Sequence, residues 1–335
     1  MEPSALQTLW FFLVGFLLVG YSLLDGYDLG VGCLFSLLTE KEEEKKTLLR
    51  AIGPFWDGNE VWLLTAGAAL FAAFPPVYAT VFSGFYLALM LVLFALIFRA
   101  VSLEFRGHDP RRTSLWEMGF TLGSWVPAFL FGVALGNVIV GVPLDAAGEF
   151  RGSFLTLFRL FPMFIGFLGL STFLLHGAAY IALKTDGPLR DRAKKAAVKL
   201  WWAEALLFVS CLALSFGYLS WARTNILAWA CAAVFVAALI VLNLAFGWGN
   251  DRLAFLMTSL MFLSLWGLVG AVQYPVLVRA RETALSLTAA NASSGPLTLK
   301  VMLIIAAVGL PLVIAAVVFL HRVFRGKVRD GDPGY

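Results

Sequence analysis

Apolar residues dominate this chain in long runs that short polar stretches separate. The runs fall at nine places: 7–38, 51–75, 77–105, 115–141, 157–183, 198–221, 225–246, 253–275 and 298–324. Each run is longer than the roughly 20 apolar residues that a helix needs to cross a bilayer. The pattern therefore predicts an all-α integral membrane protein with about nine transmembrane helices.

The composition agrees with this pattern. Hydrophobic residues fill 60% of the 335 positions, and charged residues fill only 14%. Soluble domains carry about 25% charged residues, and a single soluble core cannot bury so many apolar side chains. The net charge of +4 is small, and basic residues of membrane proteins gather in cytoplasmic loops. The composition thus argues against a soluble enzyme and against a protein that binds nucleic acid.

The basic residues alternate between two sets of loops. One set, at 39–50, 106–112, 184–199, 252 and 322–329, holds most lysines and arginines. The opposite set holds only Arg151, Arg223, Arg279 and Arg281, with Arg159 and Lys300 at helix entrances. The positive-inside rule then predicts an N-terminus outside and a C-terminus in the cytoplasm. Removing one span would disturb the alternation, so nine spans fit better than eight.

The chain reads as a single polytopic membrane domain, 1–335. The first run follows only one charge, Glu2, and is too long for a signal peptide, so we expect a retained helix. The longest external segment, 276–297, is too short for a catalytic domain.

A short internal similarity allows two interpretations. Leu23-Leu24-Asp25-Gly26 in the first helix resembles Leu174-Leu175-His176-Gly177 in the fifth, and a tryptophan and a carboxylate open the helix that follows each. The match is either chance or the trace of two related four-helix bundles, 1–141 and 157–275, with an extra helix at 298–324. Both interpretations stay open.

Ionisable residues at depth are the exceptions that carry chemistry. Four acids fall near the predicted cytoplasmic face of the first two helices: Asp25, Asp28, Asp57 and Glu60. Spacings of three residues place each pair on one helix face, and Arg99 and Arg106 end the third helix on the same side. An ionisable group in hydrocarbon costs about 2.5–3.5 kcal/mol and normally faces protein or water. The cluster is either an ion-pair network, in which Arg99 or Arg106 neutralises the acids, or a proton path.

Few other residues indicate chemistry. His176 is the only histidine inside a span. No second residue at the same depth could serve as a haem ligand, so the sequence does not favour haem binding. The three cysteines are odd in number and lack metal-binding spacing, so we expect buried thiols at Cys33, Cys211 and Cys231. The chain has no nucleotide-binding loop, catalytic triad or cysteine metal motif.

The first two predicted helices carry two acidic motifs, LDGYDLGVG at 24–32 and WDGNEVWL at 56–63. Together these motifs resemble subunit II of the cytochrome bd quinol oxidases. The resemblance continues through Gly141-Val142-Pro143 and Ser286-Leu287-Thr288, and it covers essentially the whole chain. After residue 288 this chain has Ala289-Ala290-Asn291 where family members often have Trp-Asp, so the role of that loop does not carry over.

The resemblance implies a role that depends on a partner. Oxidases of this family, in the bacterial inner membrane, reduce O2 to water with electrons from quinol and protons from the cytoplasm. Haems b558, b595 and d belong to subunit I, so we expect no haem in this chain, although some members hold a structural quinone in subunit II. The implied partners are subunit I, which is obligate, the substrates quinol and O2, membrane lipid, and as a further candidate a small single-helix subunit.

The resemblance also assigns candidate residues. The family's acidic positions map onto Asp25, Asp28 and Asp57, and we expect these acids to relay protons while Arg99 balances their charge. Glu60 joins this proton path, although other members can have glutamine there. We expect Trp56 and Trp62 to serve a gas path or packing, and His176 is the weakest candidate. The alternative functions are a stand-alone proton- or cation-coupled transporter, which also uses acids in glycine-broken helices, and a purely structural scaffold.

Overall fold

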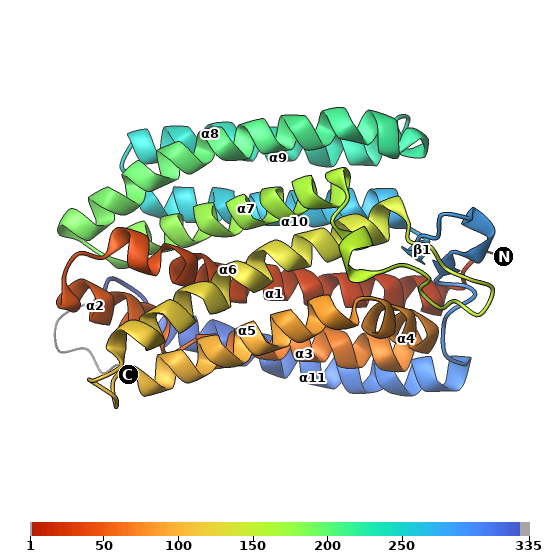
Figure 1. The fold of residues 1–335 in the computed structure, drawn as a ribbon, viewed down its shortest axis with the longest axis horizontal. Coiled ribbons are helices and arrows are strands. Elements are labelled where there is room, and N and C mark those ends of the chain that lie inside the picture. Colours follow the sequence, from red (N-terminus) through yellow and green to blue (C-terminus); the bar gives the residue numbers. More distant parts are fainter. Residues whose placement is uncertain (1, 329–335) are drawn as a thin grey trace.

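The computed structural model describes residues 2–328, and long helices that run side by side form most of it (Figure 1). The helices are α1 (Ala5–Leu38), α2 (Glu42–Ile52), α3 (Trp56–Ala73), α4 (Pro75–Gly84), α5 (Tyr86–Phe105), α6 (Thr113–Val140), α7 (Leu160–Lys184), α8 (Gly187–Tyr218), α9 (Ile226–Gly247), α10 (Asp251–Gln273) and α11 (Pro296–Val323). Short 3-10 turns lie at Phe154–Leu157, Ser220–Ala222 and Thr283–Leu285, and strands β1 (Val276–Val278) and β2 (Leu287–Thr288) pair antiparallel. The predicted all-α membrane class is confirmed.

Eight helices of the described region are long and apolar enough to cross a membrane, namely all except α2, α3 and α4. The predicted run 51–75 becomes α3, whose 18 residues include Asp57, Asn59 and Glu60 in the first two turns. These polar residues lower its hydropathy, so the count of nine spans stays a prediction.

The predicted run 77–105 is not one helix. It is divided into α4, which begins at Pro75, and α5, which begins at Tyr86. Proline suits the first turn of a helix because its missing N–H would have no partner there. Both pieces are apolar, so hydropathy alone could not show the break.

Helix α1 lies in the middle of the bundle. It packs against α3, α6, α7 and α10, while α8 with α9 and α11 with α3 form opposite margins in Figure 1. Its closest approach is to α7, because a Cβ atom on Gly30 would lie only 2.1 Å from the Phe173 carbonyl oxygen and 2.7 Å from Gly177 Cα. A central α1 places its acidic motif deep in the protein. Whether the two halves descend from a repeat stays a prediction.

The two ends of the bundle are distinct. The start of α1 lies at one end with the α6–α7 connection and the β1–β2 segment (Figure 1), and Trp10 Nε1 there donates to the Leu299 carbonyl at 3.0 Å. The end of α11 lies at the other, where Lys184 Nζ donates to the Phe324 carbonyl at 2.7 Å. The basic loops predict that this second end is cytoplasmic, and the last residue of that basic set, Arg329, lies outside the described residues.

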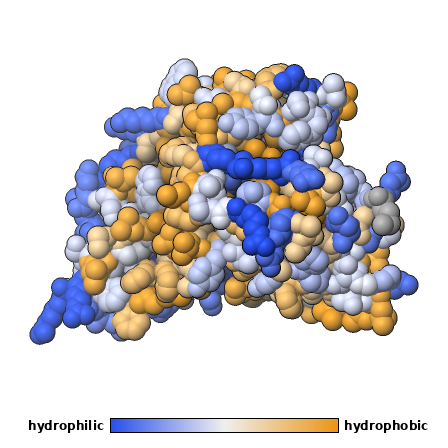
Figure 2. Space-filling model, turned by 45° about the vertical axis from the view of Figure 1, so that its right-hand side comes forward, coloured by the Kyte–Doolittle hydropathy of each residue, from blue (hydrophilic) through white to orange (hydrophobic). Residues whose placement is uncertain are grey.

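The sides of the bundle are apolar. Figure 2 shows exposed hydrophobic residues among polar ones on the face in view, and none of the most apolar stretch of α11 is buried. Such a surface suits lipid or partner helices. The cysteines are free thiols; Cys33 and Cys211 are buried as predicted, and Cys231 is half-buried.

Candidate functional site

A buried ion pair joins α1 to α5. Asp25 and Arg99 are both fully buried. Arg99 Nη2 lies 2.6 Å from Asp25 Oδ1, and Arg99 Nη1 lies 3.0 Å from Asp25 Oδ2. Two parallel charge-assisted hydrogen bonds are the strongest arrangement that arginine makes with a carboxylate. Arg99 therefore fixes both the position and the charge of Asp25.

The same arginine reaches a second acid on α3. Arg99 Nη1 lies 3.0 Å from Glu60 Oε1, and the Glu60 side chain is 24% exposed. One guanidinium thus serves two carboxylates, and Glu60 is the member of this group that borders the surface. The group connects the centre of the bundle to its outside.

Asp28 is buried without a cation in contact. Its Oδ2 accepts a hydrogen bond from Asn59 Nδ2 at 2.8 Å, and the same nitrogen lies 2.8 Å from Tyr27 Oη and 3.1 Å from the Leu24 carbonyl oxygen. Asp28 Oδ1 has no hydrogen-bond partner within residues 2–328. A buried carboxylate is costly to keep charged unless it is paired, so Asp28 is the acid best placed to take up a proton.

The structure separates the other predicted members of the cluster. Asp57 is exposed on α3, one turn before Glu60. Arg106 pairs with Glu42 at 2.9 Å and with Glu117 at 2.7 Å. Of the two arginines that the sequence offered as partners of the acids, Arg106 lies beyond the end of α5, where acids of α2 and α6 pair with it instead. Arg99 is the residue that neutralises the cluster.

The remaining candidates have structural surroundings. The Trp62 ring packs on α1, where a Cβ atom on Gly20 would lie 2.1 Å from it, and Trp56 is buried in the same core. His176 Nδ1 lies 2.8 Å from Thr258 Oγ1, and His176 Nε2 lies 3.0 Å from the Leu23 carbonyl oxygen. With both ring nitrogens bonded to protein, His176 ties α7 to α1 and α10 and does not present a nitrogen to a haem iron.

Sequence reasoning missed three residues with polar contacts inside the bundle, of which Tyr27 and Glu204 are buried and His321 is half-buried. Tyr27 Oη lies 3.3 Å from His321 Nε2 on α11. Glu204 on α8 is fully buried and accepts a hydrogen bond from Thr172 Oγ1 at 2.8 Å. The sequence could have pointed to two of them, because Tyr27 lies between two motif acids and Glu204 is an acid inside a span. Nothing in the sequence joins residue 321 to residue 27.

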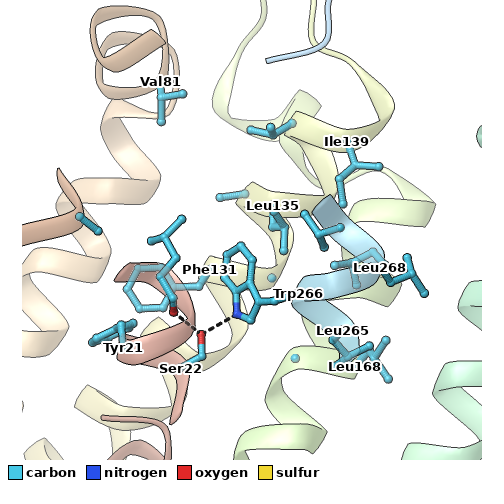
Figure 3. A pocket seen from close by; sticks show the side chains of 18 of the residues that line it. Tyr21, Ser22, Val81, Phe131, Leu135, Ile139, Leu168, Leu265, Trp266 and Leu268 are labelled. Carbon is cyan, nitrogen blue, oxygen red and sulfur yellow. Dashed lines mark hydrogen bonds between the residues drawn. The ribbon is translucent and has the colours of Figure 1, made fainter. Parts of the chain in front are cut away.

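A large apolar cavity opens beside α1 (Figure 3). Its volume is about 1030 Å³, and its walls come from α1, α6, α7, α10 and neighbouring helices. The polar groups in Figure 3 are few: Trp266 Nε1 donates to Ser22 Oγ at 2.9 Å, and Ser22 Oγ donates to the Leu18 carbonyl at 2.9 Å. Such walls fit an apolar molecule such as a lipid chain or the tail of a quinone. Elsewhere, residues 2–328 contain no group of three or more His, Cys, Asp or Glu side chains that could hold a metal ion.

Comparisons with known proteins agree on one family. The family model described as cytochrome bd terminal oxidase subunit II matches residues 6–324. The chain is 35% identical to cytochrome bd ubiquinol oxidase subunit 2 of Bacillus subtilis, with 98% of this chain and 99% of that protein covered. It is 32% identical to cytochrome bd-I ubiquinol oxidase subunit 2 of Escherichia coli K12, with 99% and 97% covered.

A solved structure shares the fold. A chain of the bd oxidase from Geobacillus thermodenitrificans superposes with a TM-score of 0.81 at 16% identity, covering 96% of this chain and 99% of that one. None of these comparisons supports a stand-alone transporter.

Proposed function

The chain belongs to the cytochrome bd terminal oxidase subunit II family, and from that premise we propose that its buried acids carry protons toward the haem-bearing partner subunit. As a member it is one subunit of a quinol oxidase complex and a multi-pass protein of the bacterial inner membrane. The resemblance assigns haems b558, b595 and d to subunit I. The chemistry of this chain is therefore the holding and transfer of protons.

The arrangement of Asp28, Glu60 and Asp57 supports the proposal. Asp28 is buried and lacks a cation in contact, Glu60 is partly exposed, and Asp57 is exposed one turn away. The Arg99–Asp25 ion pair stays charged and keeps the neighbouring acids in position while protons pass. We assign proton exchange to Asp28, Glu60 and Asp57, and we assign a positioning role to Asp25 with Arg99. Asp57 is the acid that can hand a proton to a neighbouring subunit.

Asp28→Asn and Asp57→Asn should each slow quinol-dependent O2 consumption of the purified complex by at least about tenfold, because a positioned acid or base typically contributes a hundredfold or more to a proton-transfer step. The haem spectra should stay unchanged. Glu104→Gln is the matched control, since Glu104 is an exposed acid near the end of α5 and should leave the rate as it is. Wild-type rates in both variants at every pH would refute the relay, and loss of haem would make the acids structural.

Subunit I is the obligate partner in this proposal. The apolar sides of the bundle provide the surface on which subunit I, lipid or a small single-helix subunit would lie. A pull-down of this chain from its native membrane in mild detergent should bring a larger subunit with b-type and d-type haem bands in the reduced-minus-oxidised spectrum. A colourless single chain would contradict an obligate heterodimer.

The apolar cavity is our proposed place for a structural quinone. Its apolar walls suit an isoprenoid chain, and Tyr21 and Ser22 are among the few polar residues that line it. Gly169 lines this cavity, so Gly169→Leu should reduce the quinone extracted per haem from the washed complex. An unchanged quinone content would remove this assignment.

A further inference from the structure

A second cavity lies at the end of the bundle that the basic loops predict to be cytoplasmic. Its volume is about 650 Å³, and the ends of α7, α10 and α11 contribute to its walls. In contrast to the cavity of Figure 3, charged residues line it, among them Lys184, Asp251 and Arg252. His321 and Tyr180 also belong to its wall. Such a cavity can hold water in contact with an imidazole.

Hydrogen bonds lead from this cavity to Tyr27, and Tyr27 and the buried Asp28 both accept from the Asn59 amide nitrogen. His321 Nδ1 lies 2.9 Å from the Val317 carbonyl oxygen, which can only accept, so Nδ1 carries the hydrogen and the Nε2 lone pair faces Tyr27. Tyr27 Oη lies 3.3 Å from this Nε2 and 2.8 Å from Asn59 Nδ2. The same amide nitrogen lies 2.8 Å from Asp28 Oδ2. The phenol and the carboxylate therefore share one neighbour, which brings them within reach of a single bridging water.

We propose that this cavity is the proton entrance of the subunit, and that His321 and Tyr27 pass protons from its water to Asp28. The inference rests on the proposed relay, for which it supplies the missing first steps. A hydronium ion in the cavity gives a proton to His321 Nε2 and becomes water. The imidazolium gives it to the Tyr27 oxygen as the Tyr27 hydroxyl releases its own proton toward Asp28. His321 and Tyr27 end as they began, and only Asp28 has gained a proton.

The surroundings of His321 suit this role. Its ring packs on Phe55 at 4.6 Å and edge-on to Tyr27 at 6.3 Å, which orients Nε2. The cations of the same cavity are Lys184, Arg252, Arg325 and Lys327. Lys184 donates to the Phe324 carbonyl, and Lys327 pairs with Asp186.

Asp251 at the same cavity is held by Arg190 at 2.7 Å and Lys194 at 3.4 Å. In the described part of the chain no carboxylate pairs with His321, so no acid occupies its imidazole.

A tyrosine pair provides the test. Tyr27→Phe removes the hydroxyl that links His321 to Asn59 and should slow turnover of the intact oxidase about tenfold. Tyr218→Phe is the control, because Tyr218 ends α8 and does not line this cavity. The control variant should retain the wild-type rate. Equal rates for Tyr27→Phe and the wild type would refute the proposal that protons enter through His321 and Tyr27.

A histidine variant gives a readout that a structural role would not move. His321→Ala should slow turnover to a similar degree, and imidazole added to the buffer should restore a large part of the rate, because the cavity is open to small molecules. A slow variant that imidazole does not restore would overturn the role of His321. Slow Asp28→Asn with full-rate Tyr27→Phe would leave the relay standing and remove only this entrance, whereas full rates in all these variants would remove the relay itself.

Discussion

Replacing Arg99 with methionine should destabilise the subunit by about 3–5 kcal/mol, because breaking one partner of a buried ion pair leaves an uncompensated charge. Arg99 and Asp25 are both fully buried, and they are joined by two hydrogen bonds. Removal of the guanidinium also leaves Glu60 without its cation. We expect a sharply lower yield of assembled oxidase. In detergent, the thermal transition, measured by haem absorbance, should occur at a lower temperature.

Two further variants separate the buried pair from charge removal in general. Arg151→Met should leave the thermal transition close to that of the wild type, because its side chain is 64% exposed and its partners Asp145 and Glu149 can be hydrated when the pairs are lost. Arg99→Met combined with Asp25→Asn should recover much of the stability, since the buried charge is then gone. If the single Arg99 variant melted like the wild type, the buried network would not be holding α1, α3 and α5 together.

The positions of the spans could be predicted well from hydropathy. The run 225–246 became Ile226–Gly247, and the run 115–141 became Thr113–Val140. Lipid imposes this regularity, because every backbone polar group in the bilayer must be paired within its own helix. The break at Gly84–Phe85 escaped prediction because both sides of it are equally apolar.

The site could be predicted only in part. The spacing of Asp25 and Asp28 placed both on one face of α1, and the structure buries both. The rotation of α3 could not be derived, and it decides that Asn59 faces α1 while Asp57 is exposed. The pairing of Tyr27 with His321 spans 294 positions, and only tertiary packing could reveal it.

Gly30→Ala should disrupt the contact between α1 and α7. The added methyl group would lie 2.1 Å from the Phe173 carbonyl oxygen and 2.7 Å from Gly177 Cα. Both are backbone atoms, so relief requires that a whole helix moves. We expect a cost at or above the upper end of the 1–3 kcal/mol typical of overpacked cores, about 3 kcal/mol.

Gly15→Ala is the control, because it lies on the same helix and no atom of the described residues lies within 4 Å of its added Cβ. Alanine is the better helix former, so this variant should be as stable as the wild type or gain up to about 1 kcal/mol. Thermal transitions of the assembled oxidase measure both effects. Gly30 follows Asp28 by two residues, so a displaced α1 should also slow turnover even in the complexes that assemble. A Gly30→Ala oxidase with wild-type stability would mean that α1 does not approach α7 this closely, and the burial of Asp28 would lose its structural basis.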